Sequence, residues 1–267
     1  MANDNKFVLI TGGTMGIGYE LAKVFAAHHY NLVLVARTQE DLLESQKELE
    51  GKYQIKVVPM VRDLFNEYSP FSLYQEIAAK NIRIDVLVNN AGQGHYGEFA
   101  ETDLNHELNI IQLNINSLVI LTKLFIKDML ERGEGKILNL SSIASKAPGP
   151  LQAVYHGTKA FVQSFTEAVR EEVKDKGIVI TALLPGVTDT DFFRKAGMLD
   201  AKNVREGNLD DPAKVAKDGF DALMAGEDMV ISGFKNKATV GLTSVLPDSI
   251  KAAQVHKQQA PVGGNKK

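Results

Sequence analysis

Short apolar runs alternate with longer stretches of helical periodicity along most of the chain. The runs are continuous rather than alternately apolar and polar, which is typical of parallel strands covered by helices on both faces. Because strand and helix alternate strictly, the pattern predicts right-handed crossovers and a doubly wound α/β sheet of about seven parallel strands. The predicted strands span residues 7–10, 32–35, 55–60, 86–88, 136–142, 178–184 and 229–231.

The stretches between these runs carry the helical pattern with different clarity. Ile17, Leu21 and Phe25 fall on one face of a first helix. Thr38, with Asp41 three residues later, predicts a capping box at the start of a second helix that reaches about residue 49. The remaining predicted helices span about residues 68–79, 103–131, 154–174, 189–195 and 212–224.

Length and composition favour one globular domain. The chain has 267 residues, of which 44% are hydrophobic and 24% charged, and α/β domains often reach about 250 residues as one unit. We therefore expect a single domain over residues 1–250. No acidic side chain follows Asp248, whereas four lysines and the pair Gly263–Gly264 do, so residues 251–267 are expected to form a flexible, basic tail.

Charge and cysteine content exclude several classes of function. The chain has 30 Lys and Arg against 33 Asp and Glu, a net charge of −3, which argues against general electrostatic binding of nucleic acid. It has no cysteine, so disulfides, thiolate metal sites and cysteine nucleophiles are excluded. The histidines show no metal-ligand spacing, and we expect no metal site.

The sequence shows no targeting or membrane signal. The N-terminus enters an apolar strand without a charged and then apolar leader. The longest apolar-rich stretch, Ile110 to Leu130, contains Gln112, Lys123 and other polar residues, whereas a spanning helix needs about 20 nearly unbroken apolar residues. We expect a cytoplasmic protein without stable membrane insertion.

The residues that follow each strand carry the candidate chemistry, because ligands of a doubly wound sheet bind at the carboxyl ends of its strands. After the first predicted strand, Gly12, Gly16 and Gly18 precede a helix. Such glycines allow a tight turn and a close approach of the backbone, and the helix N-terminus offers N–H groups to a pyrophosphate. The pattern favours a dinucleotide site over a glycine-rich turn without a ligand.

Three further strand ends extend this interpretation. After the second strand, Ala36 provides no carboxylate and Arg37 offers a forked donor, which favours the 2′-phosphate of NADP; a solvated arginine is the alternative. Asp63, after the third strand, can accept from an adenine amino group or lie in a solvated loop. After the fourth strand, Asn89–Gly92 suit a flat ligand lying against the backbone, or form a simple turn.

A candidate proton-transfer site follows the fifth predicted strand. Tyr155 comes thirteen residues after Ser142, and Lys159 shares the helical face of Tyr155 one turn later. A phenol has an ordinary pKa of about 10, and a nearby cation stabilises the phenolate, so Lys159 is expected to lower the pKa of Tyr155. Each residue has a structural alternative in packing, solvation or a turn, but their combination at one strand–loop–helix junction favours acid–base catalysis.

These motifs together resemble the short-chain dehydrogenase/reductase family, in its short single-domain branch. Residues 11–18 match T-G-x-x-x-G-x-G, residues 89–92 match N-N-A-G, and residues 155–159 match Y-x-x-x-K. The resemblance covers about residues 6–232 and implies a Rossmann-type fold. Ser117 and Thr188 depart from the family pattern, in which Gly and Val are common at these positions.

The resemblance implies an oxidoreductase that interconverts a carbonyl and an alcohol by hydride transfer, with NADP(H) preferred over NAD. It implies that Tyr155 exchanges the proton, Ser142 holds the substrate oxygen, Lys159 binds the nicotinamide ribose and Asn114 anchors a water. The implied catalytic residues are thus Asn114, Ser142, Tyr155 and Lys159. The expected cofactor-binding residues are Gly12, Thr14, Gly16, Ile17, Gly18, Arg37, Asp63, Leu64, Asn90, Ala91, Gly92, Tyr155, Lys159, Pro185, Gly186, Thr188 and Thr190.

Two other functions are compatible with such a fold: a non-catalytic sensor that binds NADP, and an isomerase or epimerase with a bound cofactor. A sensor has no need of the proton-transfer residues, and the chain leaves little length for the second. The expected substrate is a partly apolar carbonyl compound or alcohol, under a lid at about residues 188–210. Candidate walls are residues 94–96, 147–151 and 188–199, in which His95 is expected to be a loop residue rather than a catalytic acid.

The long central helix carries more apolar surface than one contact with a sheet requires. Because its apolar residues cover more than one stripe, we expect a second covering surface and therefore a homodimer or homotetramer. These residues are Ile111, Ile115, Leu118, Val119, Leu121, Thr122, Phe125, Ile126 and Met129.

Overall fold

The computed structural model describes residues 5–262 and contains one parallel sheet of seven strands. Their order across the sheet is β3-β2-β1-β4-β5-β6-β7, so the doubly wound sheet expected from the sequence is confirmed. The strands are β1 (Phe7–Thr11), β2 (Asn31–Ala36), β3 (Val57–Val61), β4 (Ile84–Asn89), β5 (Gly135–Leu140), β6 (Ile178–Leu184) and β7 (Met229–Ile231).

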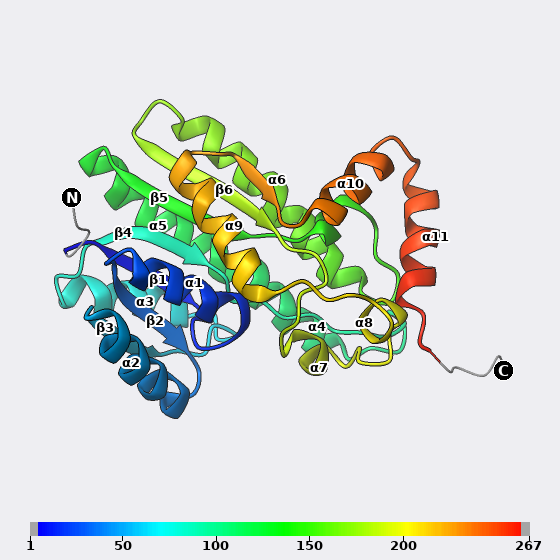
Figure 1. The fold of residues 1–267 in the computed structure, drawn as a ribbon, viewed down its shortest axis with the longest axis horizontal. Coiled ribbons are helices and arrows are strands. Elements are labelled where there is room, and N and C mark those ends of the chain that lie inside the picture. The colour runs from blue at the N-terminus through cyan, green and yellow to red at the C-terminus, as the bar shows by residue number, and fades with distance from the viewer. Residues whose placement is uncertain (1–4, 263–267) are drawn as a thin grey trace.

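Helices cover both faces of the sheet, and a further group lies beyond the carboxyl ends of its strands, at the right of Figure 1. The covering helices are α1 (Gly16–Ala27), α2 (Gln39–Tyr53), α3 (Ser69–Ala79), α5 (Ser117–Arg132), α6 (Ala153–Val173) and α9 (Pro212–Ala225). The others are α4 (Leu104–Ile111), the π-helical turn η1 (Gln112–Asn116), the 3-10 turn η2 (Ile143–Lys146), α7 (Phe192–Ala196), α8 (Lys202–Arg205), α10 (Phe234–Thr243) and α11 (Asp248–Gln259).

The apolar strand runs form two buried clusters, one on each face. One cluster joins alternate residues of β1, β2 and β4 to α1 and α9, where Phe25 packs edge-to-face against Phe220 with their ring centroids 5.0 Å apart. The other joins the opposite faces of the same strands to α3 and α5, through residues such as Leu73 and Phe125. Burial on both faces explains why these strands are continuously apolar.

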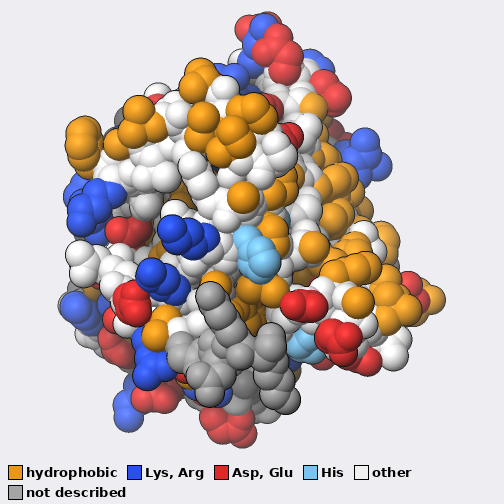
Figure 2. All heavy atoms as spheres, turned by 90° about the vertical axis from the view of Figure 1, so that its right-hand side faces the viewer, with side chains coloured by type: hydrophobic (Ala, Val, Ile, Leu, Met, Phe, Trp, Pro, Cys, Tyr) orange, Lys and Arg blue, Asp and Glu red, His pale blue; other side chains and the backbone are white. Residues whose placement is uncertain are grey.

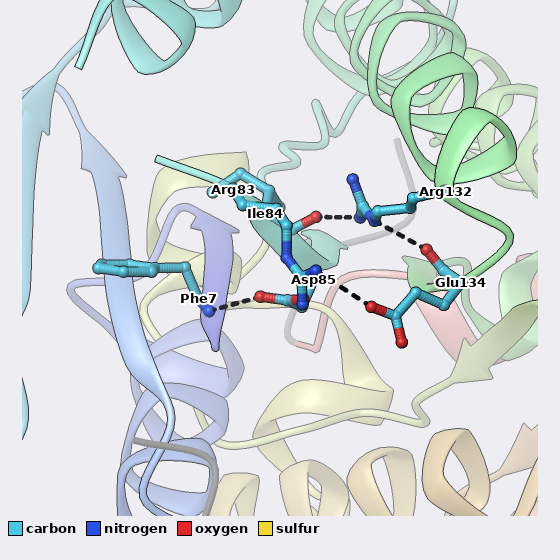
Figure 3. Close-up of polar contacts among 6 residues, drawn as sticks. All are labelled: Phe7, Arg83, Ile84, Asp85, Arg132 and Glu134. Carbon is cyan, nitrogen blue, oxygen red and sulfur yellow. Dashed lines mark hydrogen bonds and ion pairs between the residues drawn. The ribbon is translucent and has the colours of Figure 1, made fainter. Parts of the chain in front are cut away.

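The amino ends of the central strands are held by a polar cluster (Figure 3). The carboxylate of Asp85, which is buried, accepts from the backbone N–H of Phe7 at 2.9 Å and pairs with Arg83. Arg83 also pairs with Glu134, and Arg132 donates to the carbonyl oxygen of Glu134 at 2.9 Å. The cluster therefore fixes β1 against β4 at the end opposite the candidate chemistry.

A continuous helical segment, Leu104–Arg132, consists of α4, η1 and α5. Its 29 residues are long and apolar enough to cross a membrane by length and composition alone, which the sequence interpretation did not allow for. Half of its most apolar window is buried inside the protein. A single helix of this kind is weak evidence for a membrane span, because the core helix of a soluble protein meets the same criteria.

The C-terminal region differs from the flexible tail expected from residue 251. Helix α11 runs to Gln259, and this residue is buried with only 5% of its surface exposed. The phenol of Tyr96 donates to the carbonyl oxygen of Gln259 at 2.6 Å, so the end of α11 is attached to the body of the protein. Lys266 and Lys267 lie outside the described residues.

Two local expectations are also corrected. Thr38 stands at the N-cap of α2, but its side chain makes no capping hydrogen bond, so the predicted capping box is absent. The helix predicted over residues 189–195 begins only at Phe192, because residues 188 and 189 pair with Asp210 in extended backbone. Helices α8, α10 and α11 were not predicted.

Candidate active site

A cleft with a volume of about 470 Å³ lies at the carboxyl ends of the strands. Every residue expected to bind a cofactor lines it, as do Ser142 and the turn η2. Asn114 is the one predicted catalytic residue that is not part of the lining. The structure therefore brings together strand ends that are far apart in the sequence.

The glycine-rich turn forms one end of the cleft. Gly12 and Gly16 have φ angles of +65° and +54°, which an L side chain rarely adopts. A Cβ atom on Gly18 would lie 2.2 Å from the carbonyl oxygen of Gly12, so only glycine fits there. No side chain among residues 5–262 caps the start of α1, and its first N–H groups remain available to an anion.

The turn is fixed by a bridge between the ends of β1 and β4. The side-chain amide of Asn90 donates to the carbonyl oxygens of Thr11 and Gly12 at 2.9 and 3.0 Å. In return, the hydroxyl of Thr11 accepts from the backbone N–H groups of Asn90 and Ala91, each at 3.0 Å. The cleft thus has a rigid floor at the position where the strand order reverses, which is where such sheets bind ligands.

Arg37 lies at the end of β2 on the rim of the cleft. Its guanidinium stacks over the ring of Phe65 at 5.4 Å, and Thr38 and Asp41 line the same region. A guanidinium held on an aromatic face keeps its N–H groups free along the edge. The geometry therefore leaves Arg37 able to form a forked contact with an anionic group.

Ser142, Tyr155 and Lys159 lie together on one wall. The hydroxyl of Ser142 forms a hydrogen bond with Tyr155 and receives the backbone N–H of Ala144 at 3.1 Å. The ammonium of Lys159 donates to the carbonyl oxygen of Leu140 at 2.8 Å and lies 5.8 Å from the centroid of the Tyr155 ring. The expected cluster of hydroxyl, phenol and ammonium is present.

The electrostatics of this wall differ from the expectation. Burial raises the pKa of Tyr155 to about 12, although its hydrogen bond with Ser142 acts in the opposite direction. Burial also lowers the pKa of Lys159 to about 8. The predicted lowering of the Tyr155 pKa is therefore wrong, because desolvation raises it by more than the hydrogen bond with Ser142 lowers it.

Asn114 occupies the π-helical turn η1 behind the wall. Its side-chain amide donates to the carbonyl oxygen of Gln93 at 2.9 Å and to the hydroxyl of Thr158 at 3.0 Å. Its side-chain oxygen accepts from the backbone N–H of Gln93 at 3.0 Å. These bonds connect the kinked helix to the loop after β4 and to α6, and such π-turns are frequent at functional sites.

The other end of the cleft is lined by residues of α7 and of the C-terminal helices α10 and α11. The ring of Phe192 on α7 lies 5.1 Å from that of Tyr155, and Phe193 and Met198 line the same end. Opposite them, α10 and α11 contribute Val240, Val255 and other side chains. Figure 2 faces this end of the molecule and shows apolar side chains gathered on it.

The expected walls are present only in part. Of residues 147–151, Ala147 alone lines the cleft, whereas residues 94–96 and the exposed Leu199 do not. His95 instead stacks on His106 with ring centroids 4.3 Å apart. Among residues 5–262, no group of three or more His, Asp and Glu side chains could hold a metal ion.

Two buried amides of the cleft were missed by sequence reasoning. Gln152 is the N-cap residue of α6 and Gln259 ends α11, and the amide of Gln259 donates to the side-chain oxygen of Gln152 at 3.2 Å. Gln152 precedes Tyr155 by three residues. This spacing places both residues on one side of the helix start, and it could have indicated that Gln152 belongs to the cleft. No local pattern marks Gln259, because its contact crosses 107 residues.

Known proteins are similar to this chain in sequence. The sequence model of the short chain dehydrogenase family matches residues 6–198, more than half of the chain. Dehydrogenase/reductase SDR family member 7B of Mus musculus is 31% identical, over 91% of this chain and 78% of its own length. The very-long-chain 3-oxoacyl-CoA reductase of Rattus norvegicus is also 31% identical, over 91% of this chain and 76% of its own.

A solved structure is similar over nearly the same span. The short-chain dehydrogenase from Sphingobium yanoikuyae in complex with NADPH superimposes with a TM-score of 0.80 and 26% sequence identity. The superposition covers 91% of this chain and 97% of that one.

The buried ammonium generates a prediction about stability and pH. The pKa of Lys159 falls from 10.5 to about 8 on folding, so its charged form destabilises the ligand-free fold below pH 8. That penalty disappears as the pH rises from about 8 to 10.5. Lys159→Met should therefore raise the free energy of unfolding by about 1–3 kcal/mol at pH 7, after allowing for the lost hydrogen bond to Leu140.

Urea denaturation of both proteins at pH 7 and pH 10 measures this difference. It should shrink at the higher pH, and Lys80→Met, at an exposed ammonium on α3, provides the control. A difference that is the same at both pH values would contradict the prediction.

Proposed function

The chain belongs to the short-chain dehydrogenase/reductase family of oxidoreductases, and we propose that it interconverts a carbonyl and an alcohol by hydride transfer with NADP(H). One observation carries the proposal: Ser142, Tyr155 and Lys159 line the same cleft as the glycine-rich turn. A dinucleotide and a small substrate would thus meet at one proton-transfer site.

The chain's own residues provide binding and a proton path. The glycine-rich turn and the start of α1 would hold the pyrophosphate, and Lys159 would contact the nicotinamide ribose. The bound NADP(H) would supply or accept the hydride. Because Gly18 has no side chain, the start of α1 packs directly against Gly12 and Asn90, where a Cβ atom would not fit.

Tyr155 is proposed to transfer the proton and Ser142 to orient the substrate. With a pKa of about 12, the phenol is protonated at neutral pH and can donate to the substrate oxygen during reduction. The Ser142 hydroxyl would donate to the same oxygen and fix the carbon for hydride transfer. Asn114 would act from behind, by holding the helix turn and a water on the path from Lys159 to solvent.

The proposed preference for NADP rests on the end of β2. Ala36 offers no carboxylate to repel a 2′-phosphate, and Arg37 stands at the rim with its guanidinium stacked on Phe65. A charge-assisted fork to phosphate is stronger than a neutral hydrogen bond. The similar short-chain dehydrogenase from Sphingobium yanoikuyae is in complex with NADPH, which supports the same preference here.

The proposed substrate is a partly apolar carbonyl compound. Phe192, Phe193 and Met198 of the lid and Val240 and Val255 of the C-terminal helices line its end of the cleft. A relative named for reducing very-long-chain 3-oxoacyl-CoA supports an apolar chain in the substrate. A sensor without turnover is a weaker alternative, because binding alone requires neither Tyr155 nor Ser142.

We also propose that the protein is a homo-oligomer. Most of the apolar stripe of α5 is buried, but Ile115 and Val119 line a shallow hollow at the surface. Tyr68, Phe71 and Phe161, each more than a third exposed, surround it. Apolar patches of this kind mark interfaces. The cytoplasmic location stays a prediction.

The first prediction from this proposed function tests Tyr155 as the proton carrier. Tyr155→Phe should reduce kcat by at least about a hundredfold and leave NADPH affinity within a few-fold, because the ring remains but the acid is lost. Steady-state NADPH oxidation and fluorescence titration measure the two quantities. Tyr74→Phe removes a phenol that bonds Asp128 outside the cleft and serves as the control; activity of the Tyr155 variant near that of wild type would refute the assignment.

The second prediction concerns the cofactor. Wild type should prefer NADPH over NADH by roughly ten- to a hundredfold in kcat/KM, because a charge-assisted fork contributes about 1.5–3 kcal/mol. Ala36→Asp combined with Arg37→Ile should reverse the order, and Arg170→Ile on α6 should leave it unchanged. Equal use of both cofactors by wild type would show that Arg37 does not contact the phosphate.

The third prediction concerns assembly. Val119→Lys combined with Phe161→Asp should lower the mass measured by light scattering at micromolar concentration to that of one chain, because two charges would be buried in the interface. Phe234→Asp, at a residue 84% exposed on α10, is the control. A monomeric wild type would overturn the proposal directly.

A further inference from the structure

One buried side-chain amide of the cleft has a nitrogen without a hydrogen-bond partner. The side-chain nitrogen of Gln152 (Nε2) is inaccessible to water and unpaired among residues 5–262, and the residue is only 5% exposed. Three side chains meet at Gly94, as the position of an added Cβ atom on that glycine shows. Such a Cβ atom would lie 3.1 Å from Nε2 of Gln152, 2.9 Å from Cζ of Phe192 and 3.4 Å from Cδ2 of Tyr155. The unpaired nitrogen therefore lies in the same corner of the cleft as the rings of Phe192 and Tyr155.

The neighbouring side chains determine that this group is a donor. Nδ1 of His156 lies 2.8 Å from the carbonyl oxygen of Ala147, and a carbonyl can only accept, so Nδ1 carries a proton. Burial lowers the pKa of His156, which leaves the ring neutral at pH 7 and makes Nε2 of His156 an acceptor. The group of Gln259 that lies 3.3 Å from this nitrogen must then be its NH₂.

The same logic extends from Gln259 to Gln152. The NH₂ group of Gln259 also donates to the side-chain oxygen of Gln152 at 3.2 Å. With its oxygen engaged there, Gln152 must direct its own NH₂ group toward Phe192 and Tyr155. The chain from Ala147 through His156 and Gln259 thus sets the orientation of an amide that could otherwise be placed either way round.

An unpaired buried donor destabilises the fold unless a ligand satisfies it. The ring of Phe192 packs against that of Tyr155 with ring centroids 5.1 Å apart, and both line the same cleft as Gln152. A substrate that reaches Tyr155 would therefore pass close to the Gln152 nitrogen. A carbonyl oxygen close to the reacting group would then restore the missing hydrogen bond.

We propose that Gln152 is a specificity-determining residue that donates to a second oxygen of the substrate, beside the carbonyl reduced at Tyr155. The proposal rests on the proposed function and narrows its substrate class to 3-oxo esters, thioesters or amides. In these compounds one carbon separates the two carbonyl groups, so neighbouring donors can reach both oxygens. Gln259 acts as a positioning residue, because it touches Gln152 and not the substrate.

The experiment compares two substrates of matched length. Ethyl acetoacetate carries the second carbonyl oxygen, and 2-heptanone has the same number of chain atoms without it. Their ratio of kcat/KM is measured with NADPH for wild type and variants, so that the different reactivity of the two ketones cancels. Gln152→Leu should lower the ratio at least about tenfold, because sites built to hydrogen-bond a substrate group discriminate strongly.

Two further variants separate the donor from its volume. Gln152→Glu keeps the shape but presents a carboxylate oxygen to the substrate oxygen, and it should lower the ratio at least as much. Gln163→Leu removes another buried amide of α6 that does not line the cleft, and it should leave the ratio unchanged. An unchanged ratio in both Gln152 variants, or an equal fall in Gln163→Leu, would overturn the proposal.

A change at Gln259 tests the orientation. In Gln259→Glu the new carboxylate accepts rather than donates, so Gln152 should turn its NH₂ group toward residue 259 and its oxygen toward the substrate. The ratio should then fall about as far as in Gln152→Leu, while Gln259→Asn, which keeps a shorter donor, should restore part of it. A loss of stability without a change in the ratio would show a structural role alone.

Failure of this proposal differs from failure of the proposed function. If wild type oxidises NADPH with both ketones but the Gln152 variants do not alter the ratio, the function stands and the specificity proposal falls. If wild type turns over no carbonyl compound, the function falls. Ethyl acetoacetate should then still raise the melting temperature of the NADP-saturated protein more than 2-heptanone does, and Gln152→Leu should abolish that difference; no such difference would end the specificity proposal as well.

Discussion

The bridge between Thr11 and Asn90 is the interaction on which the cleft depends. Where β1 and β4 separate, the side-chain amide of Asn90 donates to the carbonyl oxygens of both Thr11 and Gly12. A Cβ atom on Gly18 would lie 2.3 Å from the nitrogen of that amide. The bridge therefore requires glycine at the start of α1 and holds open the backbone that a phosphate approaches.

The same enclosure determines the charge states of the catalytic wall. Lys159 is buried and Tyr155 half-buried, and desolvation favours the neutral form of each. A neutral phenol is the form that can donate a proton, whereas the ammonium of Lys159 is held at the expense of stability. Such conflicts between stability and local chemistry are typical of functional sites. The ring of Phe192 packs against that of Tyr155, with ring centroids 5.1 Å apart, and adds to this enclosure.

The parts that could be predicted from the sequence are those in which a local pattern has one physical cause. Strands such as β1 and β4 are continuously apolar because both faces are buried, and topology then collects their polar ends at one edge. The region of helices α10 and α11 has no such pattern, since Phe234, Leu242 and Val245 are exposed. The wrong expectation for Tyr155 arose because spacing reveals a nearby cation but does not reveal burial.

The division of the cleft suggests why reaction and substrate choice can change independently. The family's sequence model ends at residue 198, and all of the proposed proton-transfer residues lie before that point. Gln259, which orients Gln152 across 107 residues, lies well beyond it, on a helix attached to the body through Tyr96. Changes in α11 can therefore alter what the cleft accepts through one amide, while the bridge at Thr11 and the wall at Tyr155 stay the same. Function in such folds is located in sites rather than in the fold itself, and here the substrate half of the site depends on a segment that no motif marks.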